Sequence, residues 1–222
     1  MNLIEIISHR GFWIKENEKN TINAFKRSFE FGFGIETDIR DKNGTIVISH
    51  DIPKTLENLS LKDFLEIYSS FKINMPIFLN IKSDGIKEIV SELLIQFEVN
   101  NYYLFDMSIP EMKKYSEGFP VNFLTRISDL EEIPILLDKS KGIWIDSFYG
   151  NYPKFENLNK YIRGNFKLIF VSPELHNRKN NSFWRDLKIW LSSNDIHIKN
   201  KNIFLCTDYP LKAQQFFNSK NI

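Results

Sequence analysis

Eight short segments rich in Ile, Val, Phe and Leu recur along the chain, and most are separated by stretches with helical periodicity. The segments are residues 3–8, 34–39, 75–81, 102–106, 121–126, 142–147, 167–172 and 202–207. Apolar runs of this length are typical of strands that are buried on both faces of a parallel sheet. Eight strand-then-helix units in 222 residues predict a single (β/α)8 TIM-barrel domain comprising residues 1–222. A doubly wound open sheet is the alternative.

The segments between the apolar runs carry helix signals. Residues 20–32 place Ile22, Phe25 and Phe29 on one face, with Asn20 or Thr21 available as the N-cap. Residues 60–70 begin with an approximate capping box. We expect further helices over residues 84–97, 108–118, 128–140 (kinked or shortened by its proline), around 152–163, and 182–193.

One insertion interrupts the alternation of strands and helices. The sequence Asp-Lys-Asn-Gly at residues 41–44 is a turn signal, and a short β-branched run follows it. Residues 35–49 therefore predict a β-hairpin inserted after the second strand.

Composition limits the partners and the location. The net charge is +1, from 29 basic and 28 acidic side chains, which gives no reason to expect a nucleic-acid partner or stable attachment to an anionic membrane. Cys206 is the one cysteine, so no internal disulfide forms and a reducing, cytoplasmic location is expected. The N-terminal residues lack the pattern of a signal peptide, and no apolar stretch approaches the roughly 18–20 residues that span a bilayer.

Polar and titratable residues gather where the predicted strands end, which is where ligands bind in both candidate folds. Alternation along a strand places Glu36 and Asp38 on one face, and likewise Asn80 and Lys82. The residues at or just after strand ends are His9, Arg10, Glu36, Asp38, His50, Asn80, Lys82, Asp146, Glu174, His176 and Asp208.

This combination suits the cleavage of a phosphodiester. Two close carboxylates repel each other unless a cation lies between them, and hard oxygen ligands favour Mg²⁺ or Ca²⁺. Two histidines beside the phosphorus serve as general base and general acid. An arginine and a lysine neutralise the phosphate charge. Each residue alone is more often structural, and it is their joint occurrence that favours a site.

Several segments resemble the glycerophosphodiester phosphodiesterases, relatives of the phosphatidylinositol-specific phospholipases C with a shared TIM-barrel fold. They are "HRG" at 9–11, "NTINAF" at 20–25, "IETDIRDKNGTIVISHD" at 35–51 and "CTDYP" at 206–210. The resemblance is dense only in residues 7–51. It implies a small phosphodiester substrate, an in-line attack by a metal-bound hydroxyl or water, and a cyclic phosphate as one route. The roles that it implies are acid–base catalysis for His9 and His50, metal ligation for Glu36 and Asp38, and phosphate binding for Arg10 and Lys82.

The sequence departs from the family pattern at three places. Asn80 stands where the family carries a metal-binding glutamate two residues before the lysine; because an amide oxygen also ligates a hard cation, we expect Asn80 to be the third metal ligand. The segment "EKNT" at 18–21 replaces the usual Pro-Glu-Asn-Thr. The segment "VSPELHNR" at 171–178 is unusual, and we expect its Glu174 to contact substrate or to restore the missing carboxylate.

The same residues are compatible with two other functions. One is a phospholipase-like lyase that leaves a cyclic phosphate. Another is a degenerate barrel that binds a phosphorylated ligand or a partner protein without turnover, which the loss of one metal-binding glutamate favours. A serine hydrolase is disfavoured because the chain has no Gly-x-Ser-x-Gly motif.

Overall fold

The computed structural model describes residues 4–53, 58–118, 120–193 and 202–219. The chain divides into two compact units, of which the first is Ser8–Leu124 and the second combines Met1–Ile7 with Thr125–Ile222. Each unit is described by itself below. That residues 1–222 act as one domain stays a prediction.

Each of the eight predicted strands is present, and the inserted hairpin supplies a ninth. Their bounds are β1 Glu5–His9, β2 Gly34–Lys42, β3 Thr45–Ile48, β4 Ile77–Ile81, β5 Tyr102–Phe105, β6 Leu124–Ile127, β7 Gly142–Ile145, β8 Lys167–Val171 and β9 Ile203–Thr207. Most of their side chains are buried, as the continuous apolar runs predict.

The strand order is that of a (β/α)8 fold. It runs β5-β4-β2-β1-β9-β8-β7-β6, so strands that are successive in the chain are neighbours and the first strand lies beside the last. The pairs β2–β4, β4–β5, β7–β8 and β8–β9 are parallel, and Leu104 of β5 forms a parallel bridge with Phe123, the residue before β6. The order confirms the predicted TIM-barrel class and excludes a doubly wound sheet.

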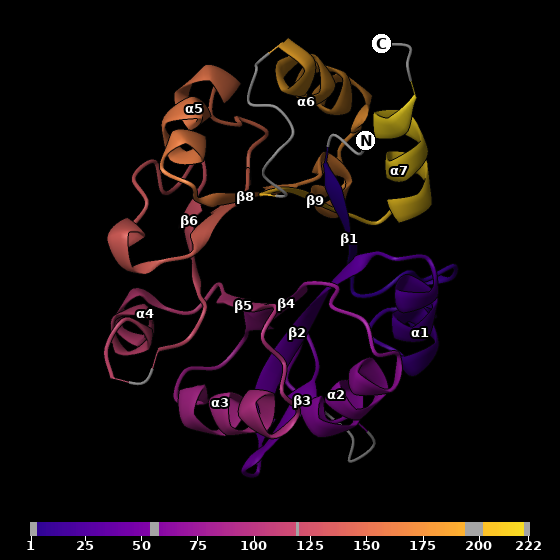
Figure 1. Cartoon of the computed structure of the whole chain (residues 1–222), viewed down its shortest axis with the longest axis vertical. Coiled ribbons are helices and arrows are strands. Elements are labelled where there is room, and N and C mark those ends of the chain that lie inside the picture. Colours follow the sequence, from indigo (N-terminus) through magenta and orange to yellow (C-terminus); the bar gives the residue numbers. More distant parts are fainter. Residues whose placement is uncertain (1–3, 54–57, 119, 194–201, 220–222) are drawn as a thin grey trace. The chain divides into compact units, whose positions relative to one another are not determined.

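Seven helices occur in the part of the chain that the structure describes. They are α1 Ile22–Glu30, α2 Leu61–Ser70, α3 Lys87–Gln96, α4 Ile109–Tyr115, α5 Phe155–Arg163, α6 Asn181–Ser193 and α7 Pro210–Asn218. In each unit the helices lie outside the strands (Figure 1). Thr21 caps α1, and Ser60 with Asp63 completes the capping box of α2, as the sequence predicts. Among the described residues, no helix is long and apolar enough to cross a membrane.

The predicted hairpin is present. Strands β2 and β3 pair antiparallel, with Ile39 opposite Ile48 and Lys42 opposite Thr45. The turn residues Asn43 and Gly44 have φ values of 51° and 80°, which are the left-handed conformations that an Asn-Gly hairpin turn needs. Because β3 runs antiparallel to β2, the residues that follow β3 lie beside Asp38, and the backbone N–H of Ser49 donates to the carbonyl oxygen of Asp38.

Two helix predictions need correction. The helix expected over residues 128–140 is absent, and only a short 3-10 turn, η2 (Leu137–Lys139), forms there. Pro134 removes a backbone donor, Leu136 is left-handed with φ 53°, and the Ser128 hydroxyl accepts the backbone N–H groups of residues 130 and 131 in a local turn. In contrast, α7 follows β9, although none of the expected helices was assigned to the residues after 207.

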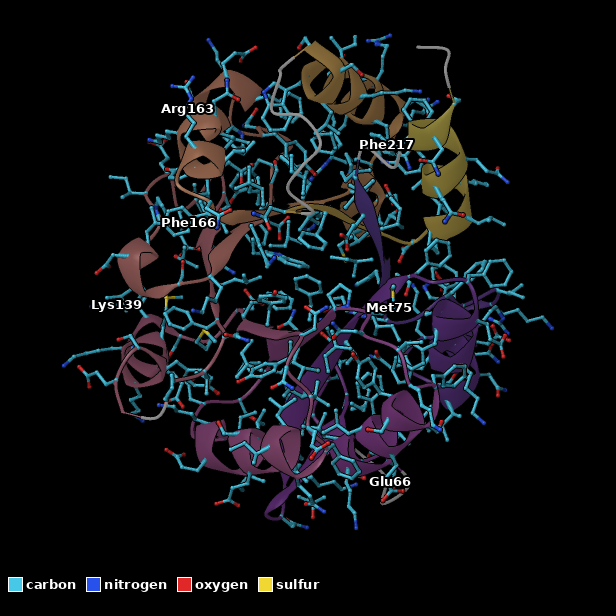
Figure 2. All side chains as sticks on the ribbon, in the orientation of Figure 1. Glu66, Met75, Lys139, Arg163, Phe166 and Phe217 are labelled. Atoms are coloured by element: carbon cyan, nitrogen blue, oxygen red, sulfur yellow. The ribbon has the colours of Figure 1, made fainter. Side chains whose placement is uncertain are left out.

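Aromatic side chains contribute to the core of each unit and pack between its helices. In the first unit, the rings of Phe25 and Phe64 join α1 to α2 with centroids 4.8 Å apart. In the second unit, Phe217 of α7 is buried and packs against Trp184 of α6, with centroids 6.0 Å apart (Figure 2). These contacts join neighbouring helices of each unit to one another around the buried strands.

Candidate active site

The chain turns sharply after β1, and this turn places the side chain of Arg10 next to β2. His9 ends the strand, and Arg10 and Gly11 both have positive φ, at 56° and 83°. The backbone N–H of Arg10 donates to the carbonyl oxygen of Glu36 at 2.8 Å and lies 3.3 Å from its carboxylate. The Nε atom of Arg10 then lies 2.9 Å from Oδ2 of Asp38. The turn therefore delivers a guanidinium to the carboxylates of the next strand.

Gly11→Ala is expected to destabilise the protein by about 2–4 kcal/mol. A Cβ at this position would lie 2.8 Å from the Cβ of Ala24 and 2.9 Å from its carbonyl carbon, and the φ of 83° adds backbone strain. Urea unfolding measures the loss. Gly32→Ala is the matched control, since Gly32 has a φ of 73° but no atom within 4 Å of its Cβ position, so its loss is expected to be about 1 kcal/mol. Equal losses in the two variants would contradict the packing argument.

Glu36 and Asp38 form a buried pair of carboxylates on one face of β2. Their exposed fractions are 2% and 1%. Burial is the main cause that raises the pKa of Glu36 to about 7, and the charge of Asp38 raises it further. The charges of His9, Arg10 and Lys82 act in the opposite direction. The raised pKa means that the ionised form of Glu36 is unfavourable in this site. A bound cation would stabilise that form, so the pair of carboxylates is suited to a cation.

Three side chains already surround Asp38. Besides Arg10, Lys82 places its Nζ 3.6 Å from Oδ1, and the amide of Asn20 donates to Oδ2 at 3.1 Å. The negative charge of Glu36 has fewer cationic neighbours than that of Asp38, because its nearest imidazole nitrogen, Nε2 of His9, lies 3.9 Å from Oε2. The structure thus brings together five of the predicted residues: His9, Arg10, Glu36, Asp38 and Lys82.

Asn80 lies beside this pair. It is opposite Asp38 in the parallel register of β2 and β4. Its Oδ1 atom is buried and has no hydrogen-bond partner among the described residues. An unpaired buried oxygen is unfavourable by about 1–3 kcal/mol, so its presence beside two carboxylates fits a hard cation as the missing partner. No group of three or more His, Cys, Asp and Glu side chains suited to a metal occurs in the described ranges, so such a site here relies on the amide.

Asn80→Glu is expected to tighten Mg²⁺ binding by about tenfold, because it adds a negative charge at short range. Asn80→Ala should weaken binding by removing an oxygen ligand. Isothermal titration of Mg²⁺ compares both with the wild type. Asn100→Glu adds the same charge at an exposed position and should leave the affinity unchanged. If neither Asn80 variant changes the affinity, Asn80 is not a ligand.

His50 follows β3 and is more exposed than His9. Its side chain is 47% exposed, compared with 14% for His9. Nδ1 of His50 lies 2.8 Å from a carboxylate oxygen of Asp51, and this contact is the first cause that lowers the pKa of Asp51. The backbone N–H of Ser49 donates to the carbonyl oxygen of Asp38, which anchors the preceding residue to β2. Among the described residues, no hydrogen bond links the His50 ring to Glu36 or Asp38.

Sequence reasoning missed two members of this cluster. Asp106 follows β5, has a φ of 68°, and places a carboxylate oxygen 3.4 Å from Nζ of Lys82. Asn20 uses its amide twice, since its Oδ1 also accepts from the hydroxyl of Thr37 at 2.8 Å. The signal for Asp106 was a carboxylate directly after an apolar run. The signal for Asn20 lay in the "EKNT" segment that departs from the family pattern.

Glu174 lies in the second unit and has a different environment. It belongs to the 3-10 turn η3 (Pro173–His176), and its carboxylate accepts hydrogen bonds from the side chains of Ser172, Thr207 and Asn180 and from the backbone N–H of Asp208. These contacts tie η3 to the ends of β8 and β9. The predicted role of Glu174 toward substrate stays a prediction.

A histidine–carboxylate pair also lies in the second unit. Nε2 of His176 is 2.7 Å from Oδ1 of Asp146, which directly follows β7. The ring of Phe148 packs edge-on against the imidazole, with centroids 5.5 Å apart. The sequence placed Asp146 and His176 at strand ends but did not predict that they pair.

Solved structures resemble the chain over nearly its whole length. A Galdieria sulphuraria protein assigned as a glycerophosphodiester phosphodiesterase has 17% identity and a TM-score of 0.73, with 97% of this chain and 98% of that chain covered. A phosphodiesterase of Oleispira antarctica, in complex with the product sn-glycerol-3-phosphate, has 15% identity and a TM-score of 0.68, with 97% of each chain covered. A Ca²⁺-dependent phosphatidylinositol-specific phospholipase C of Streptomyces antibioticus has 9% identity and a TM-score of 0.58, with 97% and 96% covered.

No protein-family model matches the chain, and no curated protein matches it in sequence. What the solved structures show is a shared TIM-barrel fold at low sequence identity. This agrees with the fold that the sequence motifs imply.

Proposed function

We propose that this protein is a metal-dependent phosphodiesterase that cleaves a glycerophosphodiester or another small phosphodiester by acid–base catalysis between His9 and His50. One observation carries the proposal: Glu36 and Asp38 are buried together in the first half of β2, with Arg10 and Lys82 close to Asp38 and an unpaired amide oxygen of Asn80 alongside. A buried site with both carboxylates and fixed cations suits a ligand that combines a metal ion with a phosphate.

Arg10 and Lys82 bind the phosphate in this proposal. Each cation is held by Asp38, at 2.9 Å from Nε of Arg10 and at 3.6 Å from Nζ of Lys82. Asp106 holds Lys82 from a second side. Because these cations are fixed before substrate binds, they stabilise the negative charge of the transition state with little reorganisation.

The two histidines divide the proton transfers. His9 is largely buried and its Nε2 lies 3.9 Å from Glu36, so its ring is held beside the carboxylates that would bind the metal and is placed to take the proton of the nucleophile. His50 is oriented by Asp51 through Nδ1, which leaves Nε2 to protonate the departing alkoxide. The exposed position of His50 suits the side from which an alcohol leaves.

Glu36, Asp38 and Asn80 would hold the divalent cation, with Mg²⁺ or Ca²⁺ as the ions that three oxygen ligands favour. When bound, such an ion supplies Lewis-acid polarisation of the phosphate and a lowered pKa of the attacking hydroxyl. Ionised Glu36 is needed for this, so loading with metal favours release of its proton.

The proposal extends to the setting of the enzyme. The 222 residues act as one domain in the cytoplasm, without nucleic acid and without stable membrane association, and the substrate class connects it to lipid metabolism. Glu174 is a further proposed substrate-binding residue, and its four hydrogen bonds to neighbours fix the position of its carboxylate.

Turnover of bis(p-nitrophenyl) phosphate tests the proposal. We expect hydrolysis that stops with EDTA and returns with Mg²⁺ or Ca²⁺. A cyclic phosphate as the final product of a glycerophosphodiester would identify a lyase instead. Absence of turnover with every divalent metal would favour a barrel that only binds its ligand, for which the amide of Asn80 in place of a carboxylate is the supporting observation.

A further inference from the structure

The first unit has a hollow of about 840 Å³ beside His50. It lies between the first turn of α1 and the described residues that follow β3 and precede α2. Its described lining consists of residues 19–23, 48–51, 58 and 59.

Two lining residues connect the hollow to the buried carboxylate Asp38 of the candidate active site. Asn20 lies in its wall and donates to the carboxylate of Asp38. His50 lies in its opposite wall, and the preceding residue Ser49 is hydrogen-bonded to the backbone of Asp38. A group bound in the hollow therefore touches the proposed general acid and lies next to the residues that hold the phosphate.

The position of His50, the proposed general acid, determines which half of the phosphodiester lies in the hollow. Hydrolysis adds the hydroxyl of water to phosphorus, breaks the bond between phosphorus and the alcohol oxygen, and leaves that oxygen with a negative charge. His50 gives it a proton, and the proton released by the water goes to His9, so the two transfers balance. The departing oxygen must lie within hydrogen-bond reach of His50, which places the alcohol half in the hollow.

The lining is rich in groups that hydrogen-bond to hydroxyls. The exposed Asn23 makes no side-chain hydrogen bond within the described residues, so its amide is available as donor and acceptor. Asn58 accepts from Nζ of Lys42 through Oδ1, which leaves its amide N–H groups to donate. Thr21 and Ser49 add hydroxyls to the same walls.

The same lining disfavours a quaternary ammonium group. None of the described lining residues is a Phe, Tyr or Trp, so they offer none of the electron-rich ring faces that bind such cations. The carboxylate of Asp51 contacts the ring of His50, and the ammonium of Lys19, which is paired with Glu16, adds no attraction for a cation.

We propose that this hollow binds the leaving alcohol of the phosphodiester and selects an uncharged polyol, such as glycerol or a cyclitol, over a quaternary ammonium alcohol. The inference rests on the proposed function and adds the class of substrate. It assigns Asn23 and Asn58 to the recognition of the alcohol hydroxyls.

Two substrates that differ only in the alcohol test the preference. The value of kcat/KM for glycerophosphoglycerol should exceed that for glycerophosphocholine by at least about tenfold. Equal values, or a preference for the choline ester, would overturn the inference while leaving the phosphodiesterase proposal intact. A protein that hydrolyses neither ester nor bis(p-nitrophenyl) phosphate would overturn both.

Variants of the two asparagines test the location. Asn23→Ala and Asn58→Ala should each lower the ratio of kcat/KM for glycerophosphoglycerol to that for bis(p-nitrophenyl) phosphate by about three- to tenfold, since each removes hydrogen bonds to the polyol. Lys26→Ala is the matched control, because Lys26 is exposed on α1 but does not line the hollow, and its ratio should equal that of the wild type. An unchanged ratio in both asparagine variants would show that the polyol binds elsewhere.

Discussion

Replacing His9 or His50 with alanine is expected to lower kcat by about 10²–10⁴-fold. The reason is that each histidine carries one of the two proton transfers that in-line cleavage of a phosphodiester requires. The double variant should be little slower than either single variant, because the two histidines act as a unit. Steady-state turnover of bis(p-nitrophenyl) phosphate measures all three.

The surroundings of the two histidines show how a loss of catalysis can be told from a loss of folding in these variants. His50 is 47% exposed and its ring pairs only with Asp51 among the described residues, so His50→Ala should keep the wild-type circular dichroism spectrum and Tm. His9 is less exposed, and its variant is compared at equal folded concentration. A single variant that is folded and retains near-wild-type kcat would remove that histidine from the mechanism.

Glu36→Gln and Asp38→Asn are each expected to lower metal-dependent turnover by at least about 10²-fold. Both replacements keep the side-chain shape but remove a negative charge from the buried pair that would hold the cation. Asp38→Asn should also loosen Arg10 and Lys82, which the carboxylate holds at 2.9 Å and 3.6 Å. Isothermal titration of Mg²⁺ should show the loss of affinity together with the loss of rate.

Glu111→Gln is the matched control for these variants. Glu111 has the same exposed fraction as Glu36, 2%, and belongs to the same unit, but its carboxylate accepts from the N–H of Gly85 and the ammonium of Lys114. The control is expected to lose stability but to keep its affinity for Mg²⁺ and its kcat. If Glu36→Gln and Asp38→Asn bind Mg²⁺ as tightly as this control, the carboxylates are not the metal ligands.

The raised pKa of Glu36 adds a dependence of stability on pH in the metal-free protein. The pKa is about 7 in the folded protein and 4.5 as the ordinary value, so below pH 4.5 the group is protonated in both states and does not oppose folding. As pH rises toward 7 the unfolded chain releases this proton more readily, and the folded state loses on the order of 2–3 kcal/mol. Thermal unfolding with EDTA between pH 5 and 8 should show this decline. Glu36→Gln should lack it.

Most strands could be predicted from the sequence because they are short apolar runs, although polar residues alternate within β2. The strand order was predictable because strand and helix segments alternate along the chain. The hairpin could be predicted from its turn, which Asn43 and Gly44 specify locally. The helix expected over residues 128–140 rested on helical spacing and a serine that could cap its start, and there Pro134 and a left-handed Leu136 prevail over that pattern. The helix α7 was missed because the proline at its first turn indicates a chain break as readily as a helix start.

The candidate site could be predicted in part. His9, Arg10, Glu36 and Asp38 come from the dense motifs of residues 7–51. Lys82 was found because it ends an apolar run, and it lies close to Asp38 as predicted from its position at the end of the neighbouring strand.

The contact between Lys82 and Asp106 depends on the pairing of β4 with β5, which local patterns do not specify. The hydrogen bonds that surround Glu174 depend in the same way on the side chains of Ser172, Thr207 and Asn180, which lie on separate elements.

The most direct measurement of the central claim is phosphorus NMR of glycerophosphoglycerol incubated with the purified protein. The account predicts release of glycerol phosphate with Mg²⁺ or Ca²⁺, no release with EDTA, and no release by His9→Ala in the presence of metal. Failure to cleave any phosphodiester with either metal, or cleavage that EDTA and the loss of His9 leave unchanged, would contradict it.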